Sequence, residues 1–219
     1  MKNPSHLLLA LPLAFSLITS AMDEDAPAQQ STPTQLVDAI NGVFGKHAGA
    51  RAIHAKGVVL EGQFTPSPSA ASISKAAHLQ TTAVPVTVRF SNFAGIPDIP
   101  DNHALASPRG LAIRFALPGG GSTDIVVHSF NGFPSPTADD FRDLLIALGT
   151  SGADAPKPTP LDGYLANHPV AKAFLTAPKP APESFATLPY YGVNTFRFIN
   201  AAGSVTFGRY QFLPVSGAH

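Results

Sequence analysis

VPVTVRFSNF, residues 84–93, carries the clearest β-strand pattern in the chain. Apolar side chains alternate with others along it: Val84, Val86, Val88 and Phe90 against Pro85, Thr87, Arg89 and Ser91. A period of two residues is typical of a strand with one buried face. Arg89 and Ser91 are therefore expected to project together from the opposite face. An arginine fixed to a strand in this way needs an anionic partner wherever it is buried.

Strand-like runs surround this stretch on both sides. KGVVLEGQF (56–64) precedes it, and GLAIRFAL (110–117) and TDIVVHSF (123–130) follow, with a hairpin-like turn at LPGGGSTD (117–124) between the last two. Two further strands are predicted in GVNTFRFIN (192–200) and GSVTFGRYQFLPV (203–215), joined by a tight turn at NAAG. The glycine run is read as a turn and not as a phosphate-binding loop.

Helical periodicity predicts three helices. The first lies in 32–49, with Thr34 as N-cap and Gly45 or Gly49 at its end, and the second lies in 136–149, with Thr137 as N-cap and Asp140 three residues later. A short third helix is expected in 168–177, and the Pro-rich segment 150–163 is read as a connection. The order helix, four strands, helices, two strands is typical of an α+β fold with an antiparallel sheet.

Composition limits the classes of function. The chain has 219 residues, is 44% hydrophobic and carries no net charge, so it suits one globular domain without a nucleic-acid-binding surface. It contains no cysteine, which excludes disulfides, thiolate metal sites and a cysteine nucleophile. There is no zinc-binding histidine motif and no nucleophile elbow of a serine hydrolase.

The N-terminus has the features of a secretory signal peptide. Lys2 precedes the apolar run HLLLALPLAFSLITSA, which ends in small residues, with Thr19 and Ala21 at the positions expected before a cleavage site. A membrane anchor is the alternative, but the run of about 15 residues is shorter than the roughly 20 needed to cross a bilayer. We expect a signal peptide in 1–21, a flexible leader in 22–33, a domain in 34–219, a periplasmic or secreted protein, and no membrane attachment after cleavage.

RAIHAKG, residues 51–57, places His54 between two cations at the start of a strand. A lone histidine on a strand is more often a structural residue than a catalytic one, so its neighbours carry the argument. Arg51 and Arg89 lie in or beside strands, where an unpaired guanidinium is costly to bury. Both arginines therefore predict a bound anion close to His54.

Four separated motifs resemble the haem catalase family in order and spacing. They are RAIHAKG, VRFSNFAG (88–95), IPDNHALASPRGLAIRF (99–115) and TDIVVHSFNGFPSPTADDF (123–141). GIPDIPDN (95–102) and YYGVNTFRFINAAG (190–203) look most like the exported branch, the catalase-related peroxidases. The resemblance covers roughly residues 34–217 and implies an eight-stranded antiparallel β-barrel with buried haem b as the cofactor.

The resemblance assigns roles residue by residue. His54 matches the distal catalytic histidine of the family, and Ser91 matches the serine that hydrogen-bonds it. Arg51 and Arg89 match arginines that pair with the haem propionates, which would be the anion they require. In such a site a neutral imidazole accepts a proton from peroxide and delivers it to the other oxygen, and burial is expected to keep His54 neutral.

Aromatic positions also match. Phe133 and Phe141 fall where aromatic residues pack near the haem and the distal pocket, and Phe93 falls near the substrate channel. The chain departs from the family where a distal asparagine is expected: His128 stands there, and Asn131 follows three residues later. His128 is either a second catalytic group that hydrogen-bonds peroxide or a residue that fills the edge of the pocket.

The second departure concerns the proximal side of the haem. The family's iron ligand is a tyrosine in an Arg-x-x-x-Tyr helix, and none of Tyr164, Tyr190, Tyr191 and Tyr210 lies in such a motif. The expected ligand would lie beyond His219, so the chain itself supplies no metal ligand. The strand count agrees, because four strands and two make about six of eight. We therefore expect an incomplete antiparallel β-barrel of catalase type with flanking helices, truncated at its C-terminus.

The expected function is that of a haem-dependent, catalase-like peroxidase acting on hydrogen peroxide or organic peroxides in the response to oxidative stress. Its partners would be peroxide and a small-molecule electron donor. One alternative is a non-catalytic remnant that binds haem weakly, through His54 or His128, or not at all. Another is a catalase-fold enzyme that rearranges lipid hydroperoxides, which the Phe-rich channel permits.

Overall fold

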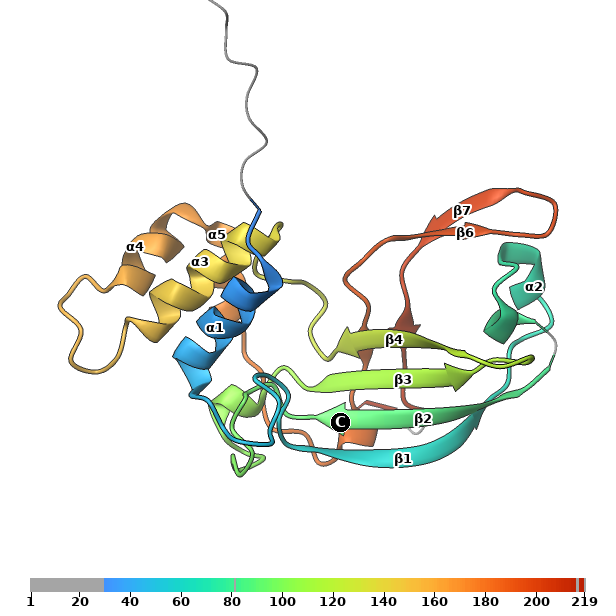
Figure 1. Ribbon diagram of the computed structural model, residues 1–219, viewed down its shortest axis with the longest axis horizontal. Coiled ribbons are helices and arrows are strands. Elements are labelled where there is room, and N and C mark those ends of the chain that lie inside the picture. The colour runs from blue at the N-terminus through green and yellow to red at the C-terminus, as the bar shows by residue number, and fades with distance from the viewer. Residues whose placement is uncertain (1–29, 81, 216, 219) are drawn as a thin grey trace, which may run out of the picture.

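The computed structural model describes residues 30–80, 82–215 and 217–218, and it shows a group of helices beside one end of a curved sheet (Figure 1). The predicted signal peptide and most of the predicted leader lie outside the described residues. Among the residues that are described, no helix is long and apolar enough to cross a membrane.

Six strands form the main sheet, in the order β1-β2-β3-β4-β5-β8 with every neighbouring pair antiparallel. The four long strands follow the predicted runs: β1 (Gly57–Phe64), β2 (Val84–Ser91), β3 (Gly110–Ala116) and β4 (Ser122–His128). The predicted α+β class with an antiparallel, incomplete barrel of six strands is therefore confirmed. Two short strands, β5 (Tyr190–Tyr191) and β8 (Gln211–Phe212), complete the sheet beyond β4.

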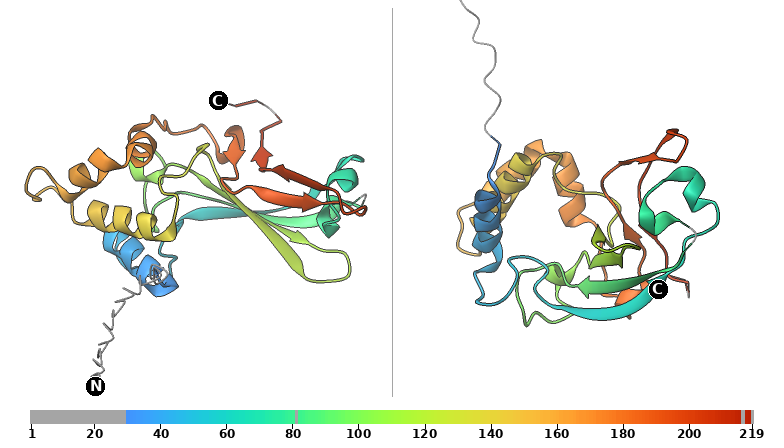
Figure 2. Two further views of the ribbon diagram at one scale, coloured as in Figure 1. Left: turned by 90° about the horizontal axis from the view of Figure 1, so that it is seen from above. Right: turned by 45° about the vertical axis from the view of Figure 1, so that its right-hand side comes forward.

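The prediction for the last two strands is wrong in one respect. The segments expected to extend the sheet pair mainly with each other, as β6 (Phe196–Ile199) and β7 (Val205–Gly208), in a separate two-stranded sheet. This hairpin rises from the main sheet and lies beside the short helix α2 (Ala70–Ile73), as both views in Figure 2 show. Backbone hydrogen bonding from Lys75 to Ile199, 2.8 Å, ties the two segments together.

The two faces of the main sheet differ in chemistry. The alternation of β2 is confirmed, because Val84, Val86 and their neighbours face a buried apolar cluster, whereas Arg89 and Ser91 belong to the opposite face. The cluster is completed from the other strands by Leu111, Ile113, Phe115, Ile125, Val127 and Tyr190. Since residues paired across an antiparallel sheet share a face, the Arg89 face is free to carry a site.

The turn between β3 and β4 is the one that the glycine run predicts. Gly119, Gly120 and Gly121 all have positive φ angles, between 79° and 101°, which residues with a side chain rarely adopt. The Leu117 N–H donates to the Gly121 carbonyl at 3.1 Å and closes the hairpin. The run is therefore a turn.

Four helices make up the neighbouring layer: α1 (Pro33–Phe44), α3 (Ala138–Gly149), α4 (Pro160–Asn167) and α5 (Pro169–Thr176). The N-cap predicted at Thr34 is wrong. Thr32 is the cap, since its hydroxyl accepts from the Gln35 N–H and the Gln35 side chain accepts from the Thr32 N–H. The Thr137 cap of α3 is confirmed. Helix α4 was not expected, because its segment is rich in proline.

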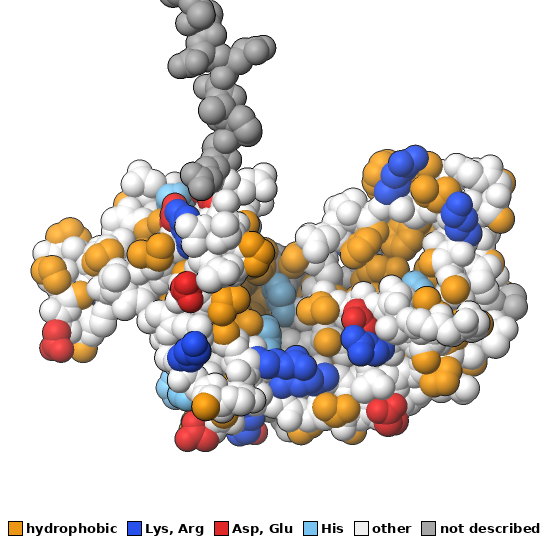
Figure 3. Space-filling view, in the orientation of Figure 1, with side chains coloured by type: hydrophobic (Ala, Val, Ile, Leu, Met, Phe, Trp, Pro, Cys, Tyr) orange, Lys and Arg blue, Asp and Glu red, His pale blue; other side chains and the backbone are white. Residues whose placement is uncertain are grey.

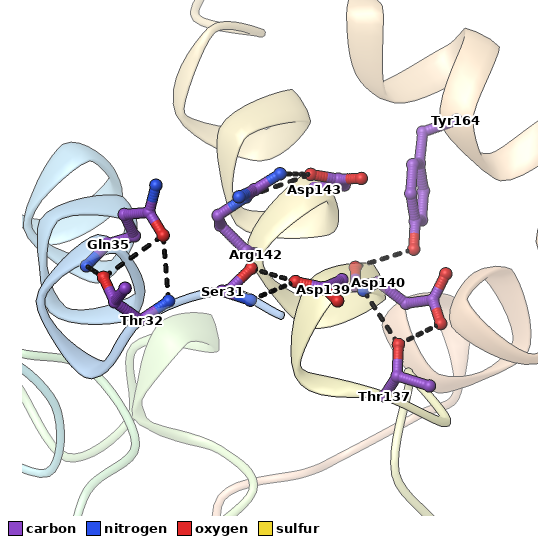
Figure 4. A network of polar contacts seen from close by, with 9 residues as sticks. All are labelled: Ser31, Thr32, Gln35, Thr137, Asp139, Asp140, Arg142, Asp143 and Tyr164. Carbon is purple, nitrogen blue, oxygen red and sulfur yellow. Dashed lines mark hydrogen bonds and ion pairs between the residues drawn. The ribbon is translucent and has the colours of Figure 1, made fainter. Parts of the chain in front are cut away.

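Polar contacts fasten the residue before α1 and the middle of α4 to α3 (Figure 4). The Ser31 N–H donates to the Asp139 carboxylate at 2.6 Å, and the Tyr164 hydroxyl donates to the Asp140 carbonyl at 2.9 Å. Apolar contacts then join α1 to the loops beside the sheet, where the Phe44 and Phe93 rings meet edge to face at 6.0 Å. The helices thereby flank the end of the sheet that carries Ser91 and His128.

Candidate active site

One row of residues crosses the sheet at the end nearest the helices. Ser91 in β2 lies opposite Gly110 in β3, and Gly110 lies opposite His128 in β4. Paired residues in antiparallel strands project from the same face, so Ser91 and His128 share a face with a glycine between them. Figure 3 shows Lys or Arg (blue) and His (pale blue) side chains gathered where the surface is hollow between the helices and the sheet.

His54 lies over this row, in the loop that leads into β1. Its Nδ1 atom is 2.9 Å from the Asn92 carbonyl oxygen and 3.0 Å from the Ser91 hydroxyl. A carbonyl oxygen only accepts hydrogen bonds, so Nδ1 of the neutral ring carries the proton and donates it there. The other nitrogen, Nε2, is left unprotonated and available to accept a proton. The predicted contact between His54 and Ser91 is thus present.

Gly110 lies directly beneath the His54 ring. A Cβ atom on Gly110 would lie 2.8 Å from both Nδ1 and Cε1 of His54 and 2.6 Å from the Ser91 hydroxyl. Real side chains essentially never approach so closely, so the imidazole occupies space that only glycine leaves open. Sequence reasoning missed this role, although a glycine opening the strand 110–117 is the signal that would have indicated it.

His128 presents the complementary tautomer. The Phe130 N–H donates to its Nδ1 at 3.2 Å, and a backbone N–H cannot accept, so Nδ1 is the unprotonated nitrogen and Nε2 carries the proton. That Nε2–H is buried and has no hydrogen-bond partner among the described residues. Burial, reinforced by the nearby His54 ring, lowers the pKa of His128 to about 4. His128 is therefore a neutral donor at neutral pH.

The cations predicted beside His54 are present. Arg89 donates to the carbonyl oxygens of His54 and Ala55, at 2.8 Å and 3.2 Å, and no ion pair joins Arg51 or Arg89 to a carboxylate in the described part of the chain. Burial and the positive charge of Arg51 both lower the pKa of Arg89. The pKa of His54 is lowered chiefly by burial and further by both arginines, so the ring is held neutral as expected.

Aromatic side chains lie beside both histidines. The Phe93 ring meets His54 edge to face at 5.6 Å, and the Phe133 ring lies 6.3 Å from His128 and 5.2 Å from Phe141. These three positions are the ones that the sequence singled out. By contrast, the exposed Asn131 side chain accepts a hydrogen bond from Arg209 at 3.2 Å. His128, not Asn131, is the residue placed in the row with Ser91.

Comparison with known proteins agrees with this geometry. The sequence profile of the catalase family matches residues 29–219. The chain belongs to the catalase family. It is 38% identical over 188 residues to a catalase-related peroxidase of Mycolicibacterium paratuberculosis, covering 84% of this chain and 58% of the relative. A catalase-related peroxidase of Synechococcus elongatus is 31% identical over 192 residues, covering 85% of this chain and 55% of the relative.

This catalase-family chain thus spans just over half the length of those relatives. A solved structure of a bacterial catalase superposes with a TM-score of 0.65 at 21% identity, and the match covers 99% of this chain and 43% of that one. The superposition shows the shared fold.

The residues present suit the periphery and one face of a haem. On the face that carries Arg89, Val59 lies opposite Arg89 in β1, and Val126 lies two residues from His128 in β4. Both valines are exposed, by 60% and 74% of their surface. Exposed apolar side chains beside unpaired cations and an orphaned N–H donor fit a flat apolar molecule with anionic substituents. No group of three potential metal-ligating side chains lies together among the described residues.

Proposed function

We propose that this catalase-family chain acts in haem-dependent reduction of peroxide. The observation that supports the proposal is the opposite protonation of the two Nε2 atoms: that of His54 accepts and that of His128 donates. Haem b, when bound, supplies the redox chemistry of oxygen–oxygen cleavage. Arg51 and Arg89 would hold its propionates, and Phe133 and Phe141 would pack near its face.

The two imidazoles divide the handling of a peroxide between them. His54 Nε2 takes the proton from one oxygen, and His128 Nε2–H donates a hydrogen bond to the same molecule and fixes its direction. The proton held on His54 then passes to the other oxygen, which leaves as water. Two electrons and two protons from a small-molecule donor, or from a second peroxide that is thereby oxidised to dioxygen, then convert the remaining oxygen to a second water. The aromatic rings keep bulk water away from this transfer.

Ser91 and Asn92 keep the base ready for this step. Hydrogen bonding at Nδ1 holds the proton on the nitrogen remote from peroxide, so that Nε2 is basic and correctly turned. The lowered pKa of His54 keeps the ring unprotonated near neutral pH. We further propose that the chain is exported after cleavage following Ala21 and acts against peroxide in the periplasm or outside the cell.

Reconstitution tests the proposal. Purified chain from residue 22 is titrated with hemin, and the bound form is mixed with hydrogen peroxide in a stopped-flow spectrometer. We expect stoichiometric haem binding and a peroxide-dependent change of the haem spectrum. Binding with two histidine ligands and no peroxide reaction would support a non-catalytic remnant, and either that result or failure to bind haem overturns the proposal. Rapid rearrangement of a fatty-acid hydroperoxide, without consumption of a donor, would favour the alternative enzyme.

A further inference from the structure

Arg109 is among the largest fully buried side chains, with 2% of its surface exposed, and it lies immediately before β3. Burying a guanidinium carries a large desolvation penalty unless its N–H groups are bonded. One of its terminal nitrogens donates to the Asn92 side-chain oxygen, and the other donates to the Asp101 carbonyl oxygen. The side chain of Phe185 covers the guanidinium, 5.6 Å from its centre. Arg109 is not among the residues to which the proposed chemistry assigns a contact with peroxide or haem.

Asn92, the partner of Arg109, is itself completely buried and connects to His54. Its backbone carbonyl is the oxygen that accepts the proton of His54 Nδ1, at 2.9 Å, and its N–H donates to the Lys56 carbonyl at 3.0 Å. Its side-chain NH₂ donates to the Asp101 carboxylate at 2.7 Å, which in turn pairs with Lys56 at 2.9 Å. The Asn92 carbonyl is therefore fixed from both its backbone and its side chain.

The main chain of Arg109 reaches the second imidazole. Its N–H donates to the Ser129 hydroxyl and its carbonyl accepts from the Ser129 N–H, both at 2.9 Å. Ser129 directly follows His128. Arg109 therefore contacts both parts of the site. Its side chain bonds to Asn92, which holds His54, and its backbone bonds to Ser129, which follows His128 at the end of β4.

His54 needs such support because its backbone is in an unfavourable conformation. Its φ angle is +57°, the one positive value found for a residue other than glycine among the described residues. A residue with a side chain keeps this conformation only where its surroundings impose it. Here the His54 N–H donates to the Phe93 carbonyl at 2.8 Å, and the following Ala55 N–H donates to the Ala94 carbonyl at 3.1 Å. Asn92 precedes these two acceptors directly in the chain.

We propose that Arg109 is a positioning residue, which acts through Asn92 to keep the proton of His54 on Nδ1 and its bare Nε2 at a fixed place relative to His128. The catalytic meaning of this orientation rests on the proposed function, whereas the orientation itself does not depend on haem. Without the guanidinium, the Asn92 carboxamide loses a bonded partner, the Asn92 carbonyl moves, and His54 is free to place its proton on either nitrogen.

The test uses Arg109→Gln in the haem-free, ¹⁵N-labelled chain. Long-range ¹H–¹⁵N correlations of the imidazoles report which nitrogen of His54 carries the proton. We expect the ratio of the Nδ1–H to the Nε2–H form to fall by about tenfold, the worth of one hydrogen bond to a charged group. Arg114→Gln is the matched control, since Arg114 lies in β3 but has a side chain that is 64% exposed and pairs with Asp124. It should leave the ratio unchanged.

An unchanged tautomer ratio in folded Arg109→Gln, or an equal change in Arg114→Gln, overturns the proposal. Should Arg109→Gln fail to fold, Arg109→Lys replaces it: an ammonium keeps the charge but cannot reproduce the planar fork that spans Asn92 and Asp101, so the ratio should still fall. If Arg109→Lys leaves the tautomer ratio of His54 unchanged, the proposal is overturned as well. If the wild-type chain mixed with hemin shows no peroxide reaction while haem-free Arg109→Gln shows the expected tautomer shift, the proposed function is refuted and this inference stands.

Discussion

Gly110 and His54 share a space that admits only one side chain. A Cβ atom on Gly110 would lie 2.8 Å from Nδ1 and from Cε1 of His54, and Gly110 itself pairs with Ser91 on one side and His128 on the other. The distance between the two imidazoles therefore depends on the absence of a side chain in β3. The register of β2, β3 and β4 therefore fixes the arrangement of the two histidines, because it places Gly110 between Ser91 and His128.

Gly110→Ala should displace the His54 ring from its place over the row. A displacement of about 1 Å at a catalytic group costs on the order of 100-fold in rate, so we expect a loss of that size in the peroxide reaction of the haem-bound chain. Gly62→Ala is the control, because a Cβ on Gly62 meets its nearest neighbour at an ordinary 3.6 Å. Equal rates in the two variants would show that His54 does not depend on this contact.

His54→Ala tests the base itself. Loss of a positioned general base reduces the rate by about 100- to 10,000-fold, and we expect this loss in the peroxide reaction per bound haem. Haem content should stay similar, because the ring bonds to Ser91 and Asn92 and carries no propionate contact in the proposed site. His47→Ala, on the exposed loop after α1, serves as control. The role is refuted if haem is lost while the rate per remaining haem is unchanged.

Arg51→Gln tests the effect of the positive charge of Arg51 on His54 and on haem binding. The guanidinium is one of two that lower the pKa of His54, so its removal should raise that pKa in the haem-free chain, as measured by NMR titration. Hemin affinity should fall by about fivefold, the value of an exposed ion pair, and the difference should shrink at high salt. Lys46→Gln, also exposed and outside the site, should alter neither quantity. An unchanged or lowered pKa contradicts the assignment.

Much of this arrangement follows from sequence pattern, and the remainder depends on tertiary contacts. The alternation in 84–91 placed Arg89 and Ser91 on one face correctly, since a period of two leaves no other choice. Asn92 and Arg109 were not found, because their roles come from bonds between segments distant in the chain. Likewise, β5 and β8 contain two residues each, too few for any period, while the longer runs at β6 and β7 pair locally.

His128→Asn tests the link between acidity and stability. The folded chain keeps His128 neutral down to about pH 4, whereas the unfolded chain protonates it near pH 6.5, so the unfolded state binds more protons between these values. Stability should therefore fall as pH falls through this window, with a share from His128 of at most about 3 kcal/mol. Urea unfolding at pH 7 and pH 4.5 should show a smaller decrease for His128→Asn than for the wild type.

The amide in that variant remains a donor, so the peroxide reaction at pH 7 should stay within about tenfold of the wild type. His47→Asn is the matched control for stability and should retain the full decrease with pH. A wild-type slope in His128→Asn would mean that the imidazole is solvated in the folded chain and that its buried Nε2–H has a partner.

Thr32→Ala and Thr34→Ala form a pair with opposite expectations. Thr32 caps α1, and its loss leaves the Gln35 N–H without its acceptor, which should lower the free energy of unfolding by about 1 kcal/mol. Thr34, the cap that sequence spacing favours, lies inside α1, where alanine has the higher helix propensity, so its replacement should be neutral or slightly stabilising. Denaturant unfolding measures both.

The Pro33 ring explains why Thr32 and not Thr34 is the cap, because proline suits the first helical turn and so places the cap directly before itself. If Thr34→Ala is the more damaging variant, α1 begins two residues later than described, and the Ser31 contact with Asp139 cannot anchor it.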